Sequence, residues 1–215
     1  MPHDPPHRAV PGSAPGSDPS RWAALRLAGL GHRDGPAQLT PLGAASLDAR
    51  VAAVLRAAQA TVPERASPRA LVVSGLSAAW AHGALAELAE PVEVTVDRAH
   101  RVRVRAHPSL VFPERRYLDG DAVPVRHGAV TAPLRTVFDL LLRPDDRLTW
   151  ADRGRDAAAT LLLGQADPRA AAARLGARLA ERARQPGSRL ARERYGQLLA
   201  ASGPDSPAPE APGTR

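Results

Sequence analysis

The sequence predicts an α/β (α+β) fold in which a small mixed sheet with packed helices precedes a C-terminal helical region. Short β-branched runs, which favour strands, occur in the middle of the chain, between about 68 and 144. Helical periodicity flanks them and continues through 145–202. With 215 residues, 44% of them hydrophobic, the chain can bury the core of one domain of ordinary size.

Composition limits the chemistry that is open to the chain. Aromatic residues make up only 3%, so the core must consist of Leu, Val and Ala. The absence of cysteine excludes disulfides, thiolate metal sites and a cysteine nucleophile, and it fits a reducing compartment. The first 20 residues lack the apolar segment of a secretory signal, and no apolar run approaches the length of a membrane span. We therefore expect a cytoplasmic protein that makes no contact with membranes.

The net charge of +7 suggests an anionic partner such as nucleic acid. Genome composition offers another explanation, because the chain has no Lys, Asn or Ile and is rich in Ala, Arg, Pro and Gly. A GC-rich genome explains why the basic residues are arginines. It does not explain why they outnumber the acids.

The composition divides the chain into five parts. Residues 1–20 and 203–215 are rich in Pro, Gly and Ser, and both tails are predicted to be disordered. A short helical N-terminal segment is expected at 21–66, an α/β core at 67–144 and a helical, Arg-rich region at 145–202.

Small polar residues mark the expected helix starts. Ser46, Asp167 and Ser188 each stand before a helical pattern, as N-cap residues do, and Pro168 suits a first turn. Before these, "RWAALRLAGL" predicts a short apolar helix. In "SLDARVAAVLRAAQA" the helical period gives one apolar face: Leu47, Val51, Val54 and Leu55.

The stretch "LVVSGLSAAWAHG" predicts a strand that turns directly into a helix. The β-branched run at 71–73 is the strand, Ser74 or Ser77 can cap the helix, and Gly83 ends it. The small residues allow this helix to lie close to the sheet, with Trp80 as an apolar anchor.

The stretch "PVEVTVDRAHRVRVRAH" contains two runs with the period of a strand, and we predict a hairpin. In that register Asp97 faces Arg101 and Glu93 faces Arg105, while Arg103 faces a threonine. The arginine ladder could bind phosphate, but we favour a solvated face on which carboxylates balance the arginines. The inward-facing residues would be Val92, Val94, Val96, Val102, Val104 and Ala106.

The stretch "LDGDAVPVRHGAVTAPLRTVFDLLLRP" predicts a turn at 119–121, two short strands around Gly128, and a helix that ends at Pro144. Thr131 or Ala132 is the expected cap, followed by Pro133 in the first turn. Arg135 and Asp139 can pair across one helical turn. An apolar stripe must pack on the rest of the fold: Leu134, Val137, Phe138, Leu141 and Leu142.

None of the catalytic motifs tested accounts for these residues. "VSGLSAA" lacks the G-x-S-x-G pattern of a nucleophile elbow, and a chain without lysine has no P-loop and no D…E-x-K nuclease site. A Ser-His-Asp set could be drawn from Ser74, His82 and Asp139, but we prefer to interpret His82 as a helix-end residue favoured by the dipole. We therefore expect no enzyme activity, cofactor, metal or small-molecule substrate.

The blocks "VVSGLSAAWAHG", "PVEVTV", "RVRVRAHPSL" and "VRHGAVTAPLRTVFDLL" follow one another between about 70 and 143. Their order resembles the C-terminal region of AbiEi-family antitoxins of the actinobacterial type. None of the blocks is a catalytic signature. The matching positions are Ser74, Ser77, Ala78, Ala79, His82 and Gly83, and then Thr131, Arg135, Thr136 and Asp139.

The resemblance implies the regulatory half of a type IV toxin-antitoxin pair. Such an antitoxin counteracts a nucleotidyltransferase-like toxin and binds its own promoter through an N-terminal winged helix. Here 21–45 is too short, and too interrupted by "GLGHRDGP", to form a whole winged helix. Two alternatives therefore stay open: a protein-interaction module whose DNA-binding part has decayed, and a non-catalytic relative of family members that carry a nuclease-like domain.

Arginines in the C-terminal helices are the candidate contacts to promoter DNA. Between 167 and 194, eight arginines and three acids give a net charge of +5. Arg174, Arg178 and Arg182 recur at every fourth position and predict a stripe that could follow phosphates without reading bases. A solvated helix face is the alternative. The candidate contacts are Arg174, Arg178, Arg182, Arg189 and Arg192.

Overall fold

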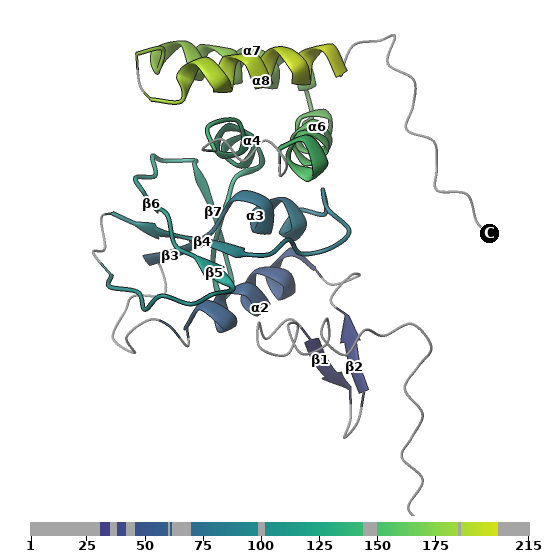
Figure 1. Ribbon diagram of the computed structural model, residues 1–215. Helices are drawn as coiled ribbons and strands as arrows, with labels where there is room; N and C mark the ends of the chain where they lie inside the picture. The colour runs from purple at the N-terminus through teal and green to yellow at the C-terminus, as the bar shows by residue number, and fades with distance from the viewer. Residues whose placement is uncertain are drawn as a thin grey trace, which may run out of the picture.

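A computed structural model of the chain (Figure 1) describes residues 31–34, 38–41, 46–59, 61, 70–98, 102–143, 150–184 and 186–201. The predicted disordered tails, 1–20 and 203–215, lie outside the described residues, and so does the short apolar helix predicted at 21–30.

The strands are β1 (Gly31–Asp34), β2 (Gln38–Pro41), β3 (Leu71–Val73), β4 (Val92–Asp97), β5 (Leu110–Val111), β6 (Glu114–Arg115), β7 (Ala122–Val125) and β8 (Gly128–Thr131). The helices are α2 (Leu47–Gln59), α3 (Gly75–Ala81), α4 (Pro133–Leu141), the π-helical turn η3 (Trp150–Gly154), α6 (Arg155–Leu163), α7 (Pro168–Glu181) and α8 (Ser188–Ala201).

The main sheet is mixed, with the strand order β5-β4-β3-β8-β7. The central strand β3 runs antiparallel to β4 and parallel to β8, while β7 and β8 form a hairpin. The strands β5 and β6 pair one after the other with β4, both in parallel. The predicted α/β fold, with its mixed sheet and C-terminal helices, is confirmed.

One face of the sheet is apolar and packs against α2. The alternate residues of β4 and the neighbouring strands point to this face, where Val73, Val94 and Val130 are fully buried. From α2, Val51 and Val54 enter the same cluster, as the helical period predicted. Burying one such side chain contributes roughly 1.5–3 kcal/mol.

A second apolar core joins α3 and α4 to the C-terminal helices. Figure 1 shows α7 and α8 as an outer layer beyond α4 and α6. Phe138 and Leu141 of α4 meet Leu162, Leu179 and Leu198 in this core. The core therefore crosses the boundary drawn from composition near 144, and the helical region shares it with the α/β part.

A single arginine connects α8 to the end of α4. The guanidinium of Arg194 is buried and donates to the carbonyl groups of Leu141 and Arg143, at 3.2 and 2.8 Å. The last carbonyls of a helix lack partners within the helix, and a cation is favoured there. Arg194, a residue far along the chain, thus provides the hydrogen-bond donors and the positive charge that stabilise the end of α4.

In the N-terminal segment, the described residues 31–34 and 38–41 form strands. The strands β1 and β2 pair antiparallel there, with Gly31 opposite Pro41 and Asp34 opposite Gln38. These residues fall in the Gly/Pro-containing stretch between the two helices predicted within 21–66, and the strand pair there was not predicted. Gly and Pro interrupt the sequence around them, and both disfavour a helix.

The prediction of a valine-rich hairpin is wrong. The strand β4 pairs in parallel with β5 and β6, which places Val96 opposite Glu114. Residues 102–106 form no strand. The amide of Arg105 donates instead to the carbonyl of Thr61, beyond the end of α2, at 2.9 Å.

The predicted balance of charges on that hairpin fails with it. Arg103 and Arg105 are exposed, while Glu93, the expected partner of Arg105, forms an ion pair with Arg143. Arg101 lies outside the described residues. Alternation identified the inward-facing valines but not the strand's partner, and Ala106, also predicted to face inward, is exposed.

Of the caps predicted at Ser46, Asp167 and Ser188, the first two are confirmed. The Ser46 hydroxyl accepts from the Ala49 amide at 3.3 Å, and the Asp167 carboxylate accepts from the Ala170 amide at 2.9 Å. Ser188 is instead the first residue of α8, and its hydroxyl donates to a carbonyl that precedes the helix.

The turn from β3 into α3 depends on Gly75. Its φ is +55°, a conformation that residues with a side chain rarely adopt. The carboxylate of Glu93 lies where a Cβ would be, so Gly75 also makes room for a charged group. Further along, Gly83 has a φ of +84° and follows α3, which confirms the predicted stop.

We predict that Gly75→Ala lowers the free energy of unfolding by at least 1–3 kcal/mol, roughly the strain of a positive φ, with the steric conflict at Glu93 in addition. Gly196→Ala is the matched control. Gly196 lies in the exposed part of α8 with no atom near its added Cβ, so this change should stabilise by about 0.5–1 kcal/mol. Urea denaturation measures both, and equal effects would contradict the assignment.

Candidate functional site

The second face of the sheet is polar and buried. Glu93 and Thr95 alternate with the valines of β4, so they point away from α2. The Thr95 hydroxyl donates to the Ser74 hydroxyl at 2.7 Å, and the Glu93 amide donates to the Ser77 hydroxyl at 2.8 Å. Both predicted motif serines therefore hold α3 against β4. Ser74 occupies the N-cap position of α3, but its hydroxyl makes no capping bond.

The Glu93 carboxylate also faces this side. It accepts from the amide of Leu76 at 3.4 Å and forms a short ion pair with Arg143. Burial raises the pKa of Glu93, and the charge and hydrogen bond of Arg143 oppose that rise. The contact joins the start of α3 to the end of α4.

His82 links the first motif block to the last. Its ring Nε2 donates to the carbonyl of Thr131 at 2.8 Å. Burial lowers the pKa of His82 and outweighs the opposing effect of this bond, so the neutral ring is favoured. His82 is the C-cap residue of α3, so it lies at the helix end as expected, but burial has a larger effect on its pKa than any favourable charge interaction there. Thr131 continues the connection, because its hydroxyl bonds that of Thr136 at 2.7 Å.

Two charged motif residues, Arg135 and Asp139, belong to a larger group that we call the ionic cluster: Arg115, Asp121, Arg135, Asp139, Arg178 and Arg182.

Asp121 is the centre of the ionic cluster. Its carboxylate accepts from the Leu118 amide at 3.0 Å, from both terminal nitrogens of Arg178 at 2.7 and 2.9 Å, and from Arg135 in a short contact. Burial alone would raise the pKa of Asp121, but the bonds from Arg178 and Leu118 and the two guanidinium charges lower it. The carboxylate is thus held in its ionised form. Its bond in turn raises the pKa of Arg178.

Asp139 forms the second ionic contact. Its Oδ1 accepts from Nε of Arg135 at 3.0 Å and lies 3.7 Å from Arg115, which confirms the predicted pair with Arg135. The pair is buried, although the sequence suggested the polar side of the helix. Burial raises the pKa of Asp139 despite both arginines, and no described group bonds its buried Oδ2.

Aromatic rings lie among the charges. The guanidinium of Arg135 stands 4.8 Å from the centre of the Tyr117 ring, and those of Arg178 and Arg182 stand 4.6 and 5.4 Å from that of Phe138. Such contacts stabilise a partly desolvated cation by roughly 0.5–2 kcal/mol. The Tyr117 hydroxyl is buried beside the side chain of Thr95. Burial and the charge of Asp139 raise its pKa.

The Ser-His-Asp set is not assembled by these contacts. Ser74 accepts from Thr95, the ring of His82 donates to a backbone carbonyl, and Asp139 binds Arg135. Each group has a different partner. These bonds connect elements of the fold and do not pass a proton from one member of the set to the next.

The three arginines of the predicted stripe do not lie on one exposed face, because the later ones point toward the interior of the protein. Positions four apart on a helix are rotated by about 40°, so two steps carry a side chain about 80° around the axis. Arg174 is exposed, Arg178 binds Asp121 with 31% of its side chain exposed, and Arg182 lies over Phe138. A stripe of three phosphate contacts along α7 is therefore wrong for Arg178, whose donors are engaged within the chain.

Arg174 also lies apart from the candidates on α8. The Tyr195 hydroxyl of α8 donates to the Ala172 carbonyl at 2.8 Å and lies close to Gly176, so these two positions mark the side of α7 that faces α8. Arg174 is two residues from each, about 160° around the helix. It therefore faces away from α8. Arg189 and Arg192 are both exposed on α8 itself.

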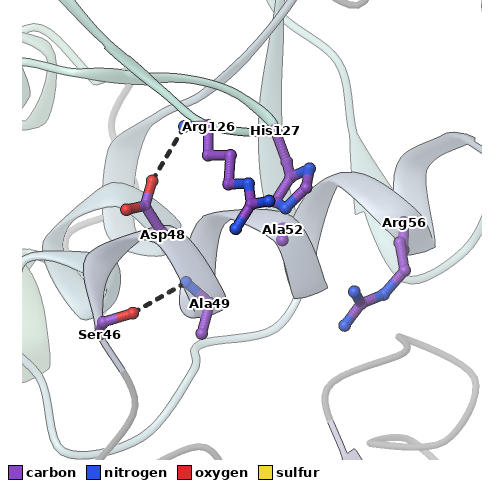
Figure 2. Close-up of a pocket in the computed structure, with 7 residues that line it drawn as sticks. All are labelled: Ser46, Asp48, Ala49, Ala52, Arg56, Arg126 and His127. Carbon is purple, nitrogen blue, oxygen red and sulfur yellow. Dashed lines mark hydrogen bonds between the residues drawn. The ribbon is translucent and has the colours of Figure 1, made fainter.

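A pocket of about 400 Å³ lies elsewhere, between α2 and the turn that joins β7 to β8. Figure 2 shows Arg126 and His127 of that turn beside the helix, with Arg56 further along it. Asp48 accepts from the backbone amide of Arg126 at 2.9 Å. Its carboxylate thus holds the hairpin turn on α2. The lining residues are Ser46, Asp48, Ala49, Ala52, Arg56, Arg126 and His127.

In the part of the chain that the structure describes, no three His, Asp or Glu residues are close enough to hold a metal ion. No described helix is both long and apolar enough to cross a bilayer.

Nothing in the sequence marks Asp121, Arg115 and Tyr117 as members of a site. Asp121 was assigned only to a turn, and its partner Arg178 is 57 residues away. Ion pairs at such a separation leave no spacing signal, unlike the pair of Arg135 and Asp139 on one helix.

We predict that Asp121→Ala lowers the free energy of unfolding by roughly 3–5 kcal/mol, because it leaves the guanidinium of Arg135 buried without its short contact. Asp119→Ala, in the same turn but exposed, should change it by no more than about 0.5 kcal/mol. Urea denaturation of both variants is the measurement. Similar losses would show that Asp121 has no special role.

We predict that stability falls between pH 7 and pH 5 less steeply in His82→Gln than in the native chain. The pKa of His82 is below 6.5 in the folded state, so the unfolded state binds the proton first and stability falls as the pH decreases through 6.5. The difference in slope can reach about 1.4 kcal/mol per pH unit, the limit for one proton. Denaturation at several pH values measures it, with His127→Gln, at an exposed position, as the control. If the free energy of unfolding changes with pH equally in the native chain and in His82→Gln, the prediction is contradicted.

Comparisons with family models, with curated proteins and with solved structures each gave no match to the chain. The likeness to AbiEi antitoxins thus stays a prediction from the motif blocks.

Proposed function

We propose that this chain is a cytoplasmic regulator of the AbiEi antitoxin type, which acts by binding and counteracts a nucleotidyltransferase-like toxin. Binding to its own promoter would be a second activity of the same protein. The proposal starts from the resemblance of the four blocks and from how their residues contact one another.

The observation that carries the proposal is the coupling between blocks. Ser74 of the first block bonds Thr95 of the second, and His82 of the first bonds Thr131 of the last. Residues that depend on one another in this way form one structural unit. Their ordered occurrence therefore supports a resemblance to a whole folded body more strongly than four separate short matches would.

The same contacts favour a role in binding. The polar side chains of the blocks hold α3 and α4 on the sheet and are buried, as Ser74, Ser77 and Asp139 illustrate. A partner must then be recognised by the surface around this body. For promoter DNA, Arg189 and Arg192 are the candidates that lie exposed together on one helix, α8, and no described carboxylate holds either of them.

Growth measurements test the antitoxin role. The chain is co-expressed with the nucleotidyltransferase-like protein encoded in the neighbouring reading frame, and growth is compared with that of cells expressing the neighbour alone. We expect growth to be restored. A chain with no such neighbour, or one that fails to restore growth, contradicts the proposal.

Gel-shift titrations with the chain's own upstream DNA at two salt concentrations test promoter binding. Replacing Arg189 and Arg192 by Ala should weaken the shift and reduce the salt dependence by about two phosphate contacts. Arg155→Ala, an exposed arginine of α6 beside Asp156, should bind as the native chain does. Restored growth with no shift at low salt would favour the alternative of a protein-interaction module without DNA binding.

A further inference from the structure

We propose that the ionic cluster binds a small oxyanion, a phosphate group, through the guanidinium groups of Arg182 and Arg115. The inference does not rest on the proposed function, because it concerns charges that the described fold leaves unbalanced.

The first argument is the count of charges. The ionic cluster holds four arginines and two aspartates, an excess of two positive charges when both carboxylates are ionised. Asp121 is occupied by Arg135 and Arg178. In the described part of the chain, Arg182 has neither a hydrogen bond nor an ion pair, and its close contact is the ring of Phe138.

The second argument is the environment of Arg182. Burial lowers its pKa, and the charges of Arg135, Arg178 and Arg115 lower it further, with Asp139 acting in the opposite direction. The neighbours therefore repel the charge on Arg182 more than they attract it. A bound anion would reverse the sign of that interaction.

The third argument is access. The side chain of Arg115 is 28% exposed and Arg182 is half-buried, while Arg135 lies beneath them with 4% exposed. An anion can reach the two outer guanidinium groups from solvent. Arg135 adds positive charge from below in a region with little water, where electrostatic attraction is stronger than at an open surface.

The chemistry of the groups selects an oxyanion. A guanidinium presents paired N–H donors that match the oxygens of phosphate, and a dianion would balance the excess of two charges.

The test uses inorganic phosphate and the full chain. Isothermal titration calorimetry and thermal unfolding are followed at constant ionic strength, with sodium chloride replaced stepwise by sodium phosphate. We expect saturable binding and a rising Tm. Arg182→Gln should bind phosphate roughly tenfold more weakly, the loss of one charge-assisted contact. Arg174→Gln, exposed on the same helix outside the ionic cluster, should bind as the native chain does.

Three results would overturn the proposal. One is an equal response of Arg182→Gln and the native chain to phosphate. Another is a phosphate effect no larger than that of chloride at the same ionic strength. The third is DNA binding that depends on Arg182 without any response to phosphate. Should Arg182→Gln fail to fold, Arg115→Gln decides the question by the same criteria.

Discussion

The carboxylate of Asp121 connects parts of the chain that lie far apart in sequence. It binds Arg135 of α4 and Arg178 of α7, while its backbone carbonyl accepts from the amide of Ala132 at the start of α4. Apolar contacts pack the C-terminal helices against α4. They do not fix the orientation of these helices relative to α4, because hydrophobic attraction is not directional. The bidentate contact between Arg178 and Asp121 does fix the orientation of α7, because both hydrogen bonds can form in only one orientation of this helix.

The two faces of the sheet contribute in different ways. The valines that face α2 gain stability by leaving water, whereas the polar face places α3 and α4 through individual hydrogen bonds. A buried bond contributes a net free energy of only about 1 kcal/mol, but leaving one partner unsatisfied costs more. Substitutions on the polar face should therefore be tolerated poorly even where little apolar area is lost.

Local patterns predicted the elements, and long-range contacts decided how they combine. The helical period and the positions of Ser46, Asp167 and Pro133 are properties of neighbouring residues, so they could be read from the sequence. The alternation at 102–106 correctly placed Val102 and Val104 toward the core.

The failed predictions concern partners. Alternation cannot distinguish a hairpin from a strand that pairs with the short β5 and β6. Similarly, a repeat of arginines at every fourth residue does not reveal that its later members turn toward Asp121 and Phe138. The polar contacts of the candidate site link residues from separate elements, so only the motif positions within one helix, Arg135 and Asp139, could be paired in advance.

The separation of Asp121 and Arg178 has a consequence for biosynthesis. Because the two residues are 57 positions apart, Arg178 leaves the ribosome about 3 to 11 seconds after Asp121 at ordinary translation rates. Until then the nascent α/β part lacks one of the cations that keep this carboxylate ionised. The C-terminal helices thus complete the electrostatics of a body that is translated before them, and this contact forms only after they have been synthesised.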